Sequence, residues 1–290
     1  NFLNITQSNF RQKSSDDIFI FCTKYLWHSR KVRTFVKSIQ TFDGQKPYMH
    51  TNPMTTTPRL YPIGIQTFEK IRESGFVYVD KTEYIYNLTH SSLSYVFLSR
   101  PRRFGKSLLV STLKSYFEGR KELFKGLAIE KMEKDWTASP VLHLDLTGSR
   151  YTSVADLAGK LDQHLLAWEN QYGVTDVFEE PATRFSAVIE AAFKKTGQKV
   201  VILIDEYDKP VVDNIDNPEL MDSFRRELQG FYSVIKNKDG FIRFAFLTGV
   251  TKFGKMSVFS GMNNLSINSV LDNKYSSYFG FTADEVMKMA

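Results

Sequence analysis

The sequence has almost no cysteine and no long apolar run. Its single cysteine, Cys22, excludes an internal disulfide framework and fits a reducing compartment, so we expect a cytoplasmic protein. No stretch reaches the roughly 18 apolar residues that a membrane-spanning helix needs, and no membrane association is expected. The five histidines show no metal-ligand spacing with the cysteine or with one another, which argues against a zinc site at His28, His50, His90, His143 and His164.

The chain also lacks a strong charge of one sign outside its first segment. Its net charge is +6, but residues 1–53 hold eight Lys and Arg against three Asp and Glu. The remaining residues hold 30 basic against 29 acidic side chains. The basicity of the chain therefore does not support nucleic-acid binding by its main part, although a neutral total can still contain a basic face.

The length and the local composition predict one main domain. A chain of 290 residues is long enough for one large α/β domain or two small ones. Residues 1–53 show no sustained period of a helix or a strand, and a Pro- and Thr-rich stretch follows at 53–58. We expect 1–53 to be a poorly ordered basic leader, Met54 to begin the functional protein, and 54–290 to form the main domain.

Strand-like and helix-like patterns alternate from Tyr61 onward. Short apolar runs predict strands at 76–79, 95–98, 141–146, 200–204 and 241–247. Apolar residues at helical spacing predict helices over 107–117, 157–168, 185–193 and from Asn217-Pro218 onward, where a cap residue precedes a proline. This alternation predicts an α/β fold in which a mainly parallel central sheet is covered by helices on both faces.

A basic turn with one glycine joins the strand at 95–98 to the helix that follows. The turn is Arg100-Pro101-Arg102-Arg103-Phe104-Gly105-Lys106-Ser107, which ends as a P-loop (Walker A) motif does but has an arginine in place of the first glycine. Backbone N–H groups at a helix start bind phosphate, and Gly105 lets the backbone approach it. Lys106 can reach the β- and γ-phosphates, and the Ser107 hydroxyl can bind Mg²⁺.

The missing first glycine leaves two interpretations of this turn. The loop is either a wider phosphate loop, in which Arg102 or Arg103 supplies charge, or a basic surface turn between a strand and a helix.

A carboxylate pair follows the apolar run at 200–204. Asp205 and Glu206 stand where a Walker B motif has its acidic residues, about 98 residues after the Gly-Lys-Ser. Asp205 would hold Mg²⁺, and Glu206 would orient and deprotonate an attacking water. The alternative is a strand that ends in an acidic turn. Asp208 remains open between a role in the site and a structural role, such as a helix or turn cap.

The strand at 241–247 ends in polar residues as well. P-loop ATPases with an inserted strand present a polar residue near the γ-phosphate at this point, and Thr248 is the first candidate for it. Thr251 is the second, and Lys252 could reach a phosphate in its own subunit or in a neighbouring one. The alternative for all three is a loop after a strand.

Five segments together carry a family resemblance, at 61–72, 78–82, 100–107, 204–210 and 247–253. They resemble the bacterial AAA-ATPase-like family over about residues 60–290, and the Arg-Pro-Arg-Arg-Phe-Gly-Lys-Ser form is itself typical of that family. The resemblance implies a P-loop NTPase three-layer sandwich that binds MgATP, with Lys106, Ser107, Asp205 and Glu206 in the roles above. It also implies ATP in preference to GTP, and places Tyr78–Thr82 near the nucleotide pocket.

Members of this family usually carry a helical lid and a PD-(D/E)XK nuclease-type domain after the ATPase core. We find no nuclease pattern in this sequence and expect both parts to be absent from the chain. DNA would then be a partner only through such a domain, and an oligomer is compatible with the sequence.

Three functions stay open from the sequence. The first is an ATPase that couples hydrolysis to a partner or C-terminal domain. The second is a nucleotide-dependent switch that binds ATP and turns over slowly. The third is a nucleic-acid-binding module whose phosphate contacts would come from Arg100, Arg102, Arg103 and Lys106.

Overall fold

The structure is a computed structural model that describes residues 60–251, 266–268, 280 and 285. Most of them lie in a compact unit that spans Leu60–Phe279. The expected leader 1–53, the start at Met54 and the side chain of Lys252 lie outside the described residues. Within the described ranges, we find no helix with both the length and the apolar character to cross a membrane.

A parallel sheet forms the centre of this unit. Its strand order is β2-β3-β4-β1-β5, and every neighbouring pair is parallel. The strands are β1 (Tyr95–Ser99), β2 (Val141–Asp145), β3 (Val200–Asp205), β4 (Ile242–Gly249) and β5 (Ser266–Asn268). Four of the five predicted strands are thereby confirmed, as is the parallel sheet.

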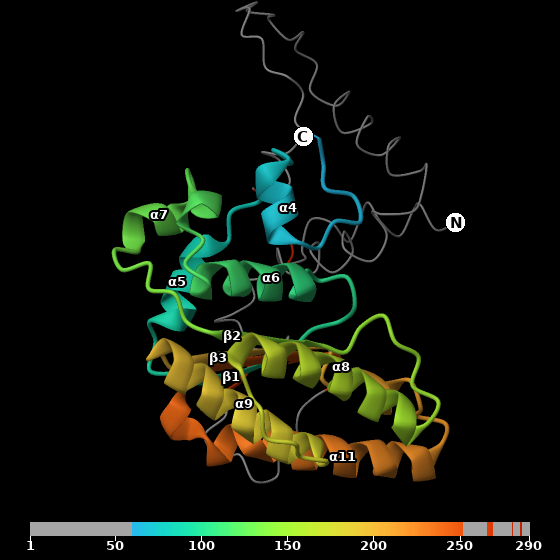
Figure 1. Cartoon of the computed structure of the whole chain (residues 1–290). Helices are drawn as coiled ribbons and strands as arrows, with labels where there is room; N and C mark the ends of the chain where they lie inside the picture. Colours follow the sequence, from blue (N-terminus) through green and yellow to red (C-terminus); the bar gives the residue numbers. More distant parts are fainter. Residues whose placement is uncertain (1–59, 252–265, 269–279, 281–284, 286–290) are drawn as a thin grey trace, which may run out of the picture. The chain divides into compact units, whose positions relative to one another are not determined.

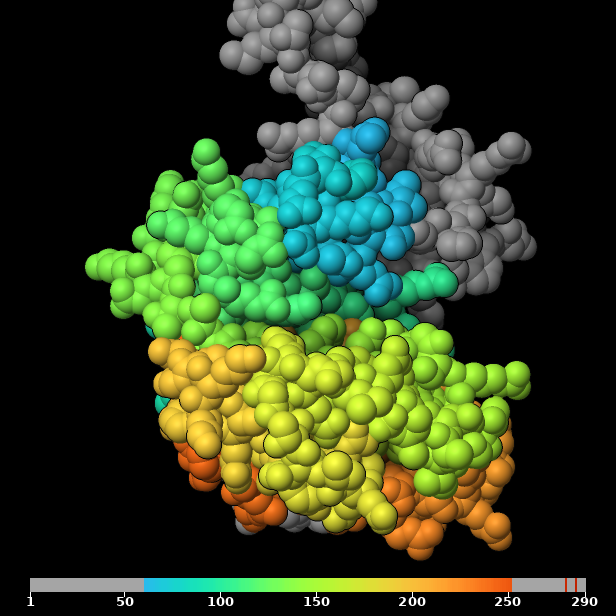
Figure 2. Space-filling view, viewed as in Figure 1, coloured from blue at the N-terminus to red at the C-terminus, as the bar shows by residue number. Residues whose placement is uncertain are grey.

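Helices cover both faces of the sheet, which gives three layers (Figure 1). One layer holds α4 (Phe68–Glu73), α5 (Thr82–Thr89), α6 (Lys106–Phe117) and α7 (Ala128–Met132). The opposite layer holds α8 (Val154–Tyr172), α9 (Pro181–Thr196) and α11 (Pro218–Asn237). Figure 2 shows the same division, with blue and green atoms in the upper part and yellow-green, yellow and orange atoms in the lower part.

The two cores follow from the alternation of side chains along β3. Val201 and Leu203 pack with the layer of α6, whereas Ile202 and Ile204 pack with α8, α9 and α11. All six residues of β3 are buried, as expected of a central parallel strand with helices on both faces. The apolar run at 200–204 is therefore continuous because neither face of this strand meets water.

Local signals set where the helices of the second layer begin. The Asn217 side chain accepts a hydrogen bond from the Leu220 amide, so α11 has the predicted cap and starts at Pro218. At α8, Ser153 and Asp156 form a reciprocal capping box. The predicted helix faces at 107–117, 157–168 and 185–193 are confirmed as α6, α8 and α9.

The predicted strand at 76–79 is wrong. These residues connect α4 to α5, and their described backbone bonds run from the amides of Phe76 and Val77 to the carbonyls of Ile71 and Leu60. The apolar character of the run instead serves packing, since the Tyr78 ring lies edge-on against Phe68 at a centroid distance of 5.1 Å. Periodicity alone cannot separate a short apolar connection from a strand.

The sheet brings three loops to one edge. Because the strands are parallel, the carboxyl ends of β1, β4 and β3 lie side by side, and β4 is hydrogen-bonded between the other two. The register pairs Ser99 with Gly249 and Ile204 with Leu247. The last residues of these strands, which include Asp205 and Thr248, and the loop that starts at Arg100 therefore meet at this edge.

Candidate functional site

The loop between β1 and α6 contains two left-handed residues. Gly105, which precedes the first residue of α6, has φ 81°, and Arg103 has φ 71°. Glycine adopts this conformation freely, whereas a residue with a side chain pays about 1–2 kcal/mol for it. Two such residues in three positions turn the chain sharply into α6, whose first N–H groups have no partner within the helix.

Lys106 is the first residue of α6 and is almost completely buried, with 4% of its surface exposed. Its Nζ donates hydrogen bonds to the carbonyl oxygens of Arg100 at 3.2 Å and Pro101 at 3.3 Å. Burial lowers the pKa of Lys106, while the carboxylates of Glu206 and Asp205 act in the opposite direction. The ammonium group is thus held inside its own loop and close to the acidic turn after β3.

The acidic turn after β3 is held by the end of β4. Thr248 is fully buried, and its hydroxyl donates a hydrogen bond of 2.6 Å to Oδ1 of Asp205. The same hydroxyl oxygen accepts a bond of 3.4 Å from the Glu206 amide. One threonine on the strand between β1 and β3 therefore contacts both members of the carboxylate pair.

Glu206 has an unusual backbone conformation, with φ 53° in the left-handed region. Strain of this kind in a residue with a side chain concentrates at functional sites. Burial raises the pKa of Glu206, Lys106 lowers it, and Asp205 raises it. The left-handed conformation begins at Glu206, directly after Asp205, which is the last residue of β3.

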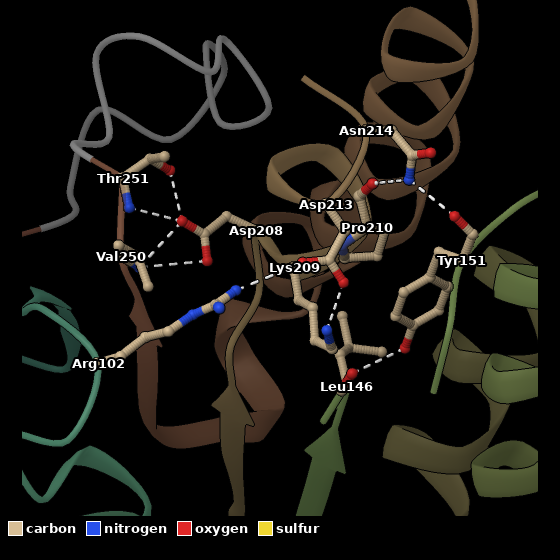
Figure 3. Close-up of polar contacts among 10 residues, drawn as sticks. All are labelled: Arg102, Leu146, Tyr151, Asp208, Lys209, Pro210, Asp213, Asn214, Val250 and Thr251. Carbon is tan, nitrogen blue, oxygen red and sulfur yellow. Dashed lines mark hydrogen bonds and ion pairs between the residues drawn. The ribbon is translucent and has the colours of Figure 1, made fainter. Parts of the chain in front are cut away.

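A buried aspartate ties the turn after β3 to the turn after β4 (Figure 3). Asp208 is 1% exposed, and its carboxylate accepts hydrogen bonds from the amides of Val250 and Thr251 and from the Thr251 hydroxyl. It precedes the four-residue helix α10 (Lys209–Val212), and its carbonyl oxygen accepts bonds from the Val211 and Val212 amides, but its side chain makes no capping bond. Of the two structural roles considered for Asp208, the turn cap is confirmed and the helix cap is wrong.

The predicted phosphate-loop residues fall into two groups. Arg100 and Lys106 are buried, and the Arg100 guanidinium donates to the Ser99 carbonyl oxygen at 3.0 Å. Arg102 and Arg103 are exposed, and Phe104 and Ser107 are partly buried. Arg102 reaches from the loop to Asp213, just past α10, with 3.4 Å between Nη2 and Oδ1 (Figure 3).

The structure joins Thr251, the second candidate after the strand at 241–247, to the acidic turn. Thr251 contacts Asp208, and its hydroxyl lies 3.3 Å from the hydroxyl of Tyr207. Tyr207 donates its backbone N–H to the Thr248 carbonyl oxygen at 2.9 Å. The turns 205–208 and 248–251 are thus connected residue by residue beyond the end of the β3–β4 ladder.

In the segment Tyr78–Thr82, Tyr78 packs against Phe68 of α4, and two polar side chains contact α7. Asp80 accepts a hydrogen bond of 2.7 Å from the Ala128 amide, and the Thr82 hydroxyl accepts one of 3.1 Å from the Ile129 amide. These bonds hold the start of α7. The placement of this segment near a nucleotide pocket, which came from the family resemblance, remains a prediction.

Sequence reasoning missed the residues that connect the site to the loop after β2. The Asn214 side chain donates to the carbonyl oxygens of Tyr151 and Pro210, each at 2.8 Å, and the Tyr151 hydroxyl donates to the Leu146 carbonyl oxygen at 2.9 Å. Asparagine after a short helix carries no sequence signal for such a contact. Gly249, the last residue of β4, does carry a sequence signal, because a glycine in a strand often marks a site where another part of the molecule approaches its backbone closely.

Comparison with known proteins identifies the family. The family model described as "Predicted AAA-ATPase" matches residues 62–259. The chain belongs to this AAA-ATPase-like family. The match includes the phosphate loop, the acidic turn and the end of β4, which the fold places at one edge of the sheet.

A relative of this AAA-ATPase-like chain comes from Azotobacter chroococcum mcd 1 and is described as an uncharacterized protein in the vnfD 5′ region. The two are 45% identical over 227 residues, which cover 78% of this chain and 43% of the relative. The chain therefore spans less than half the length of this relative. No solved structure matches the chain.

Proposed function

We propose that the chain binds MgATP at the edge where β1, β4 and β3 end, and hydrolyses it there. One observation carries this proposal: a buried lysine at a helix start and a carboxylate pair held by Thr248 meet at adjacent parallel strands. Open α/β sheets bind ligands outside the carboxyl ends of their strands. Membership of the family supports nucleotide binding.

The start of α6 is suited to the phosphates. Its free N–H groups and the positive end of the helix dipole favour an anion, and the glycine before it adds no side chain. Lys106 would exchange its two loop carbonyl partners for phosphate oxygens. Arg102 and Arg103, which are exposed, would supply the charge that the absent first glycine leaves to side chains.

Asp205 and Ser107 are the candidate ligands for Mg²⁺. Carboxylate and hydroxyl oxygens are hard ligands, and Mg²⁺ is commonly bound by one or two carboxylates together with substrate phosphates. The ion would neutralise charge that develops on the phosphates. The Thr248 hydrogen bond fixes one oxygen of Asp205, which supports its role as an oriented ligand.

Glu206 is the candidate base. It would accept a proton from a water molecule whose oxygen attacks the γ-phosphorus, while the bond to the β-γ bridging oxygen breaks and ADP leaves. Its backbone leaves the strand conformation at φ 53°, and in this proposal Asp205 serves the metal while Glu206 serves the water. Thr248, which contacts both residues, would hold the two in register.

The same site supports a second candidate, the slow nucleotide-dependent switch. It needs Lys106 and Asp205 for binding, but it does not need fast proton transfer through Glu206. The nucleic-acid module is less well supported, since two of its four basic residues, Arg100 and Lys106, are buried. Coupling of hydrolysis to a further domain, including a nuclease-type domain that acts on DNA, remains part of the proposal.

MgATP titration calorimetry on the 290-residue chain tests the proposal. Lys106→Ala is expected to weaken binding by at least a hundredfold, whereas Lys114→Ala, at the other end of the same helix, should bind as the native chain does. Glu206→Gln should keep its affinity and lose steady-state phosphate release. A single turnover at a slow rate in the native chain would favour the switch, and equal binding by both lysine variants would refute the site.

A further inference from the structure

Asp208 lies beside the proposed site, but neither the sequence nor the proposed mechanism gives it a role. It lies three residues after the last residue of β3, and 1% of its surface is exposed. A buried carboxylate is costly unless it is paired or fully hydrogen-bonded. Its hydrogen-bonding partners therefore indicate which segment of the chain Asp208 stabilises.

Those partners all belong to the two residues that follow Gly249. One oxygen, Oδ2, accepts bonds from the Val250 amide at 3.0 Å, the Thr251 amide at 2.6 Å and the Thr251 hydroxyl at 2.5 Å. The second oxygen, Oδ1, lies 3.3 Å from the Val250 amide. The carboxylate thus holds the chain in the turn that begins where β4 ends.

This contact starts where the ladder between β3 and β4 stops. The last paired residues of this ladder are Ile204 and Leu247. Beyond them, the Tyr207 N–H donates a hydrogen bond of 2.9 Å to the Thr248 carbonyl oxygen and joins the two segments. Asp208 closes the far end of this connection. Thr248 itself is paired with Leu98 in the ladder between β4 and β1, and Asp208 additionally holds the two residues that follow Gly249.

The packing leaves the connection little freedom. A Cβ built on Gly249 would lie 2.4 Å from Cε1 of Tyr207 and 2.6 Å from Oδ1 of Asp208. Tyr207 is itself fully buried, with its ring edge-on to Phe97 of β1 at 5.2 Å. The two turns therefore pack closely against each other and, through the Tyr207 ring, against β1.

We propose that Asp208 is a positioning residue, which sets the orientation of the Thr248 hydroxyl and, through it, the geometry of Asp205 and Glu206. This inference rests on the proposed hydrolysis. The Thr248 hydroxyl donates to Asp205 and accepts from the Glu206 amide, so its place determines the relation between the metal ligand and the base. Asp208, which is 1% exposed, would act through Thr248 and not directly on the nucleotide.

The consequence is a separation between binding and turnover. Phosphate affinity would depend on Lys106 and the start of α6. Among the described hydrogen bonds none joins Lys106 to Asp208, whose charge acts on Lys106 less strongly than those of Glu206 and Asp205. Turnover depends on the alignment of Asp205, Glu206 and Thr248, and a misplacement of about 1 Å can slow a reaction roughly a hundredfold. Loss of Asp208 should therefore lower kcat with little change in the affinity for MgATP.

The test compares the native chain with Asp208→Ala and Asp208→Asn for MgATP affinity, kcat and KM, each per folded protein as measured by circular dichroism. Asp208→Ala should lower kcat roughly a hundredfold and change the Kd for MgATP less than threefold. Asn keeps one acceptor oxygen for the three bonds at Oδ2, so Asp208→Asn should recover at least tenfold of the lost kcat. Thr251→Val, which removes one of those bonds, should lower kcat measurably, by roughly two- to tenfold.

Native turnover in Asp208→Ala, or a loss of affinity equal to the loss of kcat, would overturn the positioning role while leaving the ATPase intact. If the Ala variant does not fold, a native kcat in the Asn and Thr251→Val variants, together with unchanged hydrogen exchange of the Val250 and Thr251 amides, would do the same. Absence of hydrolysis in the native chain would overturn the proposed function, and positioning for hydrolysis with it.

Discussion

Arg102 of the phosphate loop and Asp213, just past α10, form an ion pair with 3.4 Å between their nearest charged atoms. The Arg102 side chain is 62% exposed and that of Asp213 is 28% exposed. Lys209 also pairs with Asp213, one turn earlier in the same segment. An arginine that would serve the phosphates is thus held by a carboxylate of the segment that follows the acidic turn.

Removal of this carboxylate should tighten nucleotide binding. In Asp213→Asn, Arg102 no longer has to leave an ion pair before it reaches a phosphate. Exposed ion pairs are worth about 0.2–1 kcal/mol, so the Kd for MgATP should fall roughly 1.5- to 5-fold at low salt. Calorimetry measures the change, and in an Arg102→Ala background the same substitution should have no effect. A tighter Kd in both backgrounds would place the effect elsewhere.

The pH dependence of turnover should report Glu206. Burial raises the pKa of this carboxyl group above its ordinary 4.5, and a base acts only when it is ionised. Turnover should therefore be lost as the pH falls through a value higher than 4.5, and be retained above it. Initial rates of phosphate release at saturating MgATP measure this acidic limb. A limb at or below pH 4.5 would contradict the assignment of Glu206 as the base.

The left-handed backbone of Glu206 should affect the free energy of unfolding of variants at this position. Glu206→Gly and Glu206→Ala both remove the carboxylate, but only glycine adopts φ 53° without steric cost. The free energy of unfolding should be roughly 0.5–1 kcal/mol higher for the Gly variant than for the Ala variant. Urea denaturation measures the difference. At Glu227, an exposed position in the middle of α11, the order should be reversed, with Ala the more stable variant.

Gly249→Ala should disturb both stability and turnover. The new methyl group would overlap the ring of Tyr207 and the carboxylate of Asp208, both of which are buried. Overpacking of this kind costs about 1–3 kcal/mol, and thermal denaturation should show it as a lower Tm. Gly230→Ala is the matched control, because a methyl group there meets nothing within 4 Å on an exposed helix position and should raise the Tm. An unchanged Tm in Gly249→Ala would mean that the two turns are loosely packed.

The fold could be predicted where a single element carries its own signal. The run at 200–204 predicted β3, and the Asn217-Pro218 pair predicted the start of α11, because each signal is local. The run at 76–79 failed for the same reason, since its side chains resemble those of a strand while its partners lie in α4 and the segment before it. The short helices α4, α5, α7 and α10 were not predicted, because fewer than nine residues give too little periodicity.

The site could be predicted in its residue types but not in its contacts. Lys106, Asp205, Glu206 and Thr248 were found because each follows a strand or begins a helix. The bond from Thr248 to Asp205 joins residues 43 positions apart, and no local pattern indicates it. The same holds for Asp208, which the sequence left open, and for the pair of Arg102 with Asp213, 111 positions apart.

The strand order has a consequence for how the chain is made. β4 is synthesised after β1 and β3, yet it lies between them in the sheet. During synthesis these two apolar strands therefore lack the strand that pairs with both of them until the ribosome has added the intervening residues. Until residue 249 has emerged, the phosphate loop and the acidic turn have no common support. A chain interrupted before residue 249 would therefore hold both sequence motifs without the strand that joins them, and MgATP binding would be expected only once β4 has taken its place.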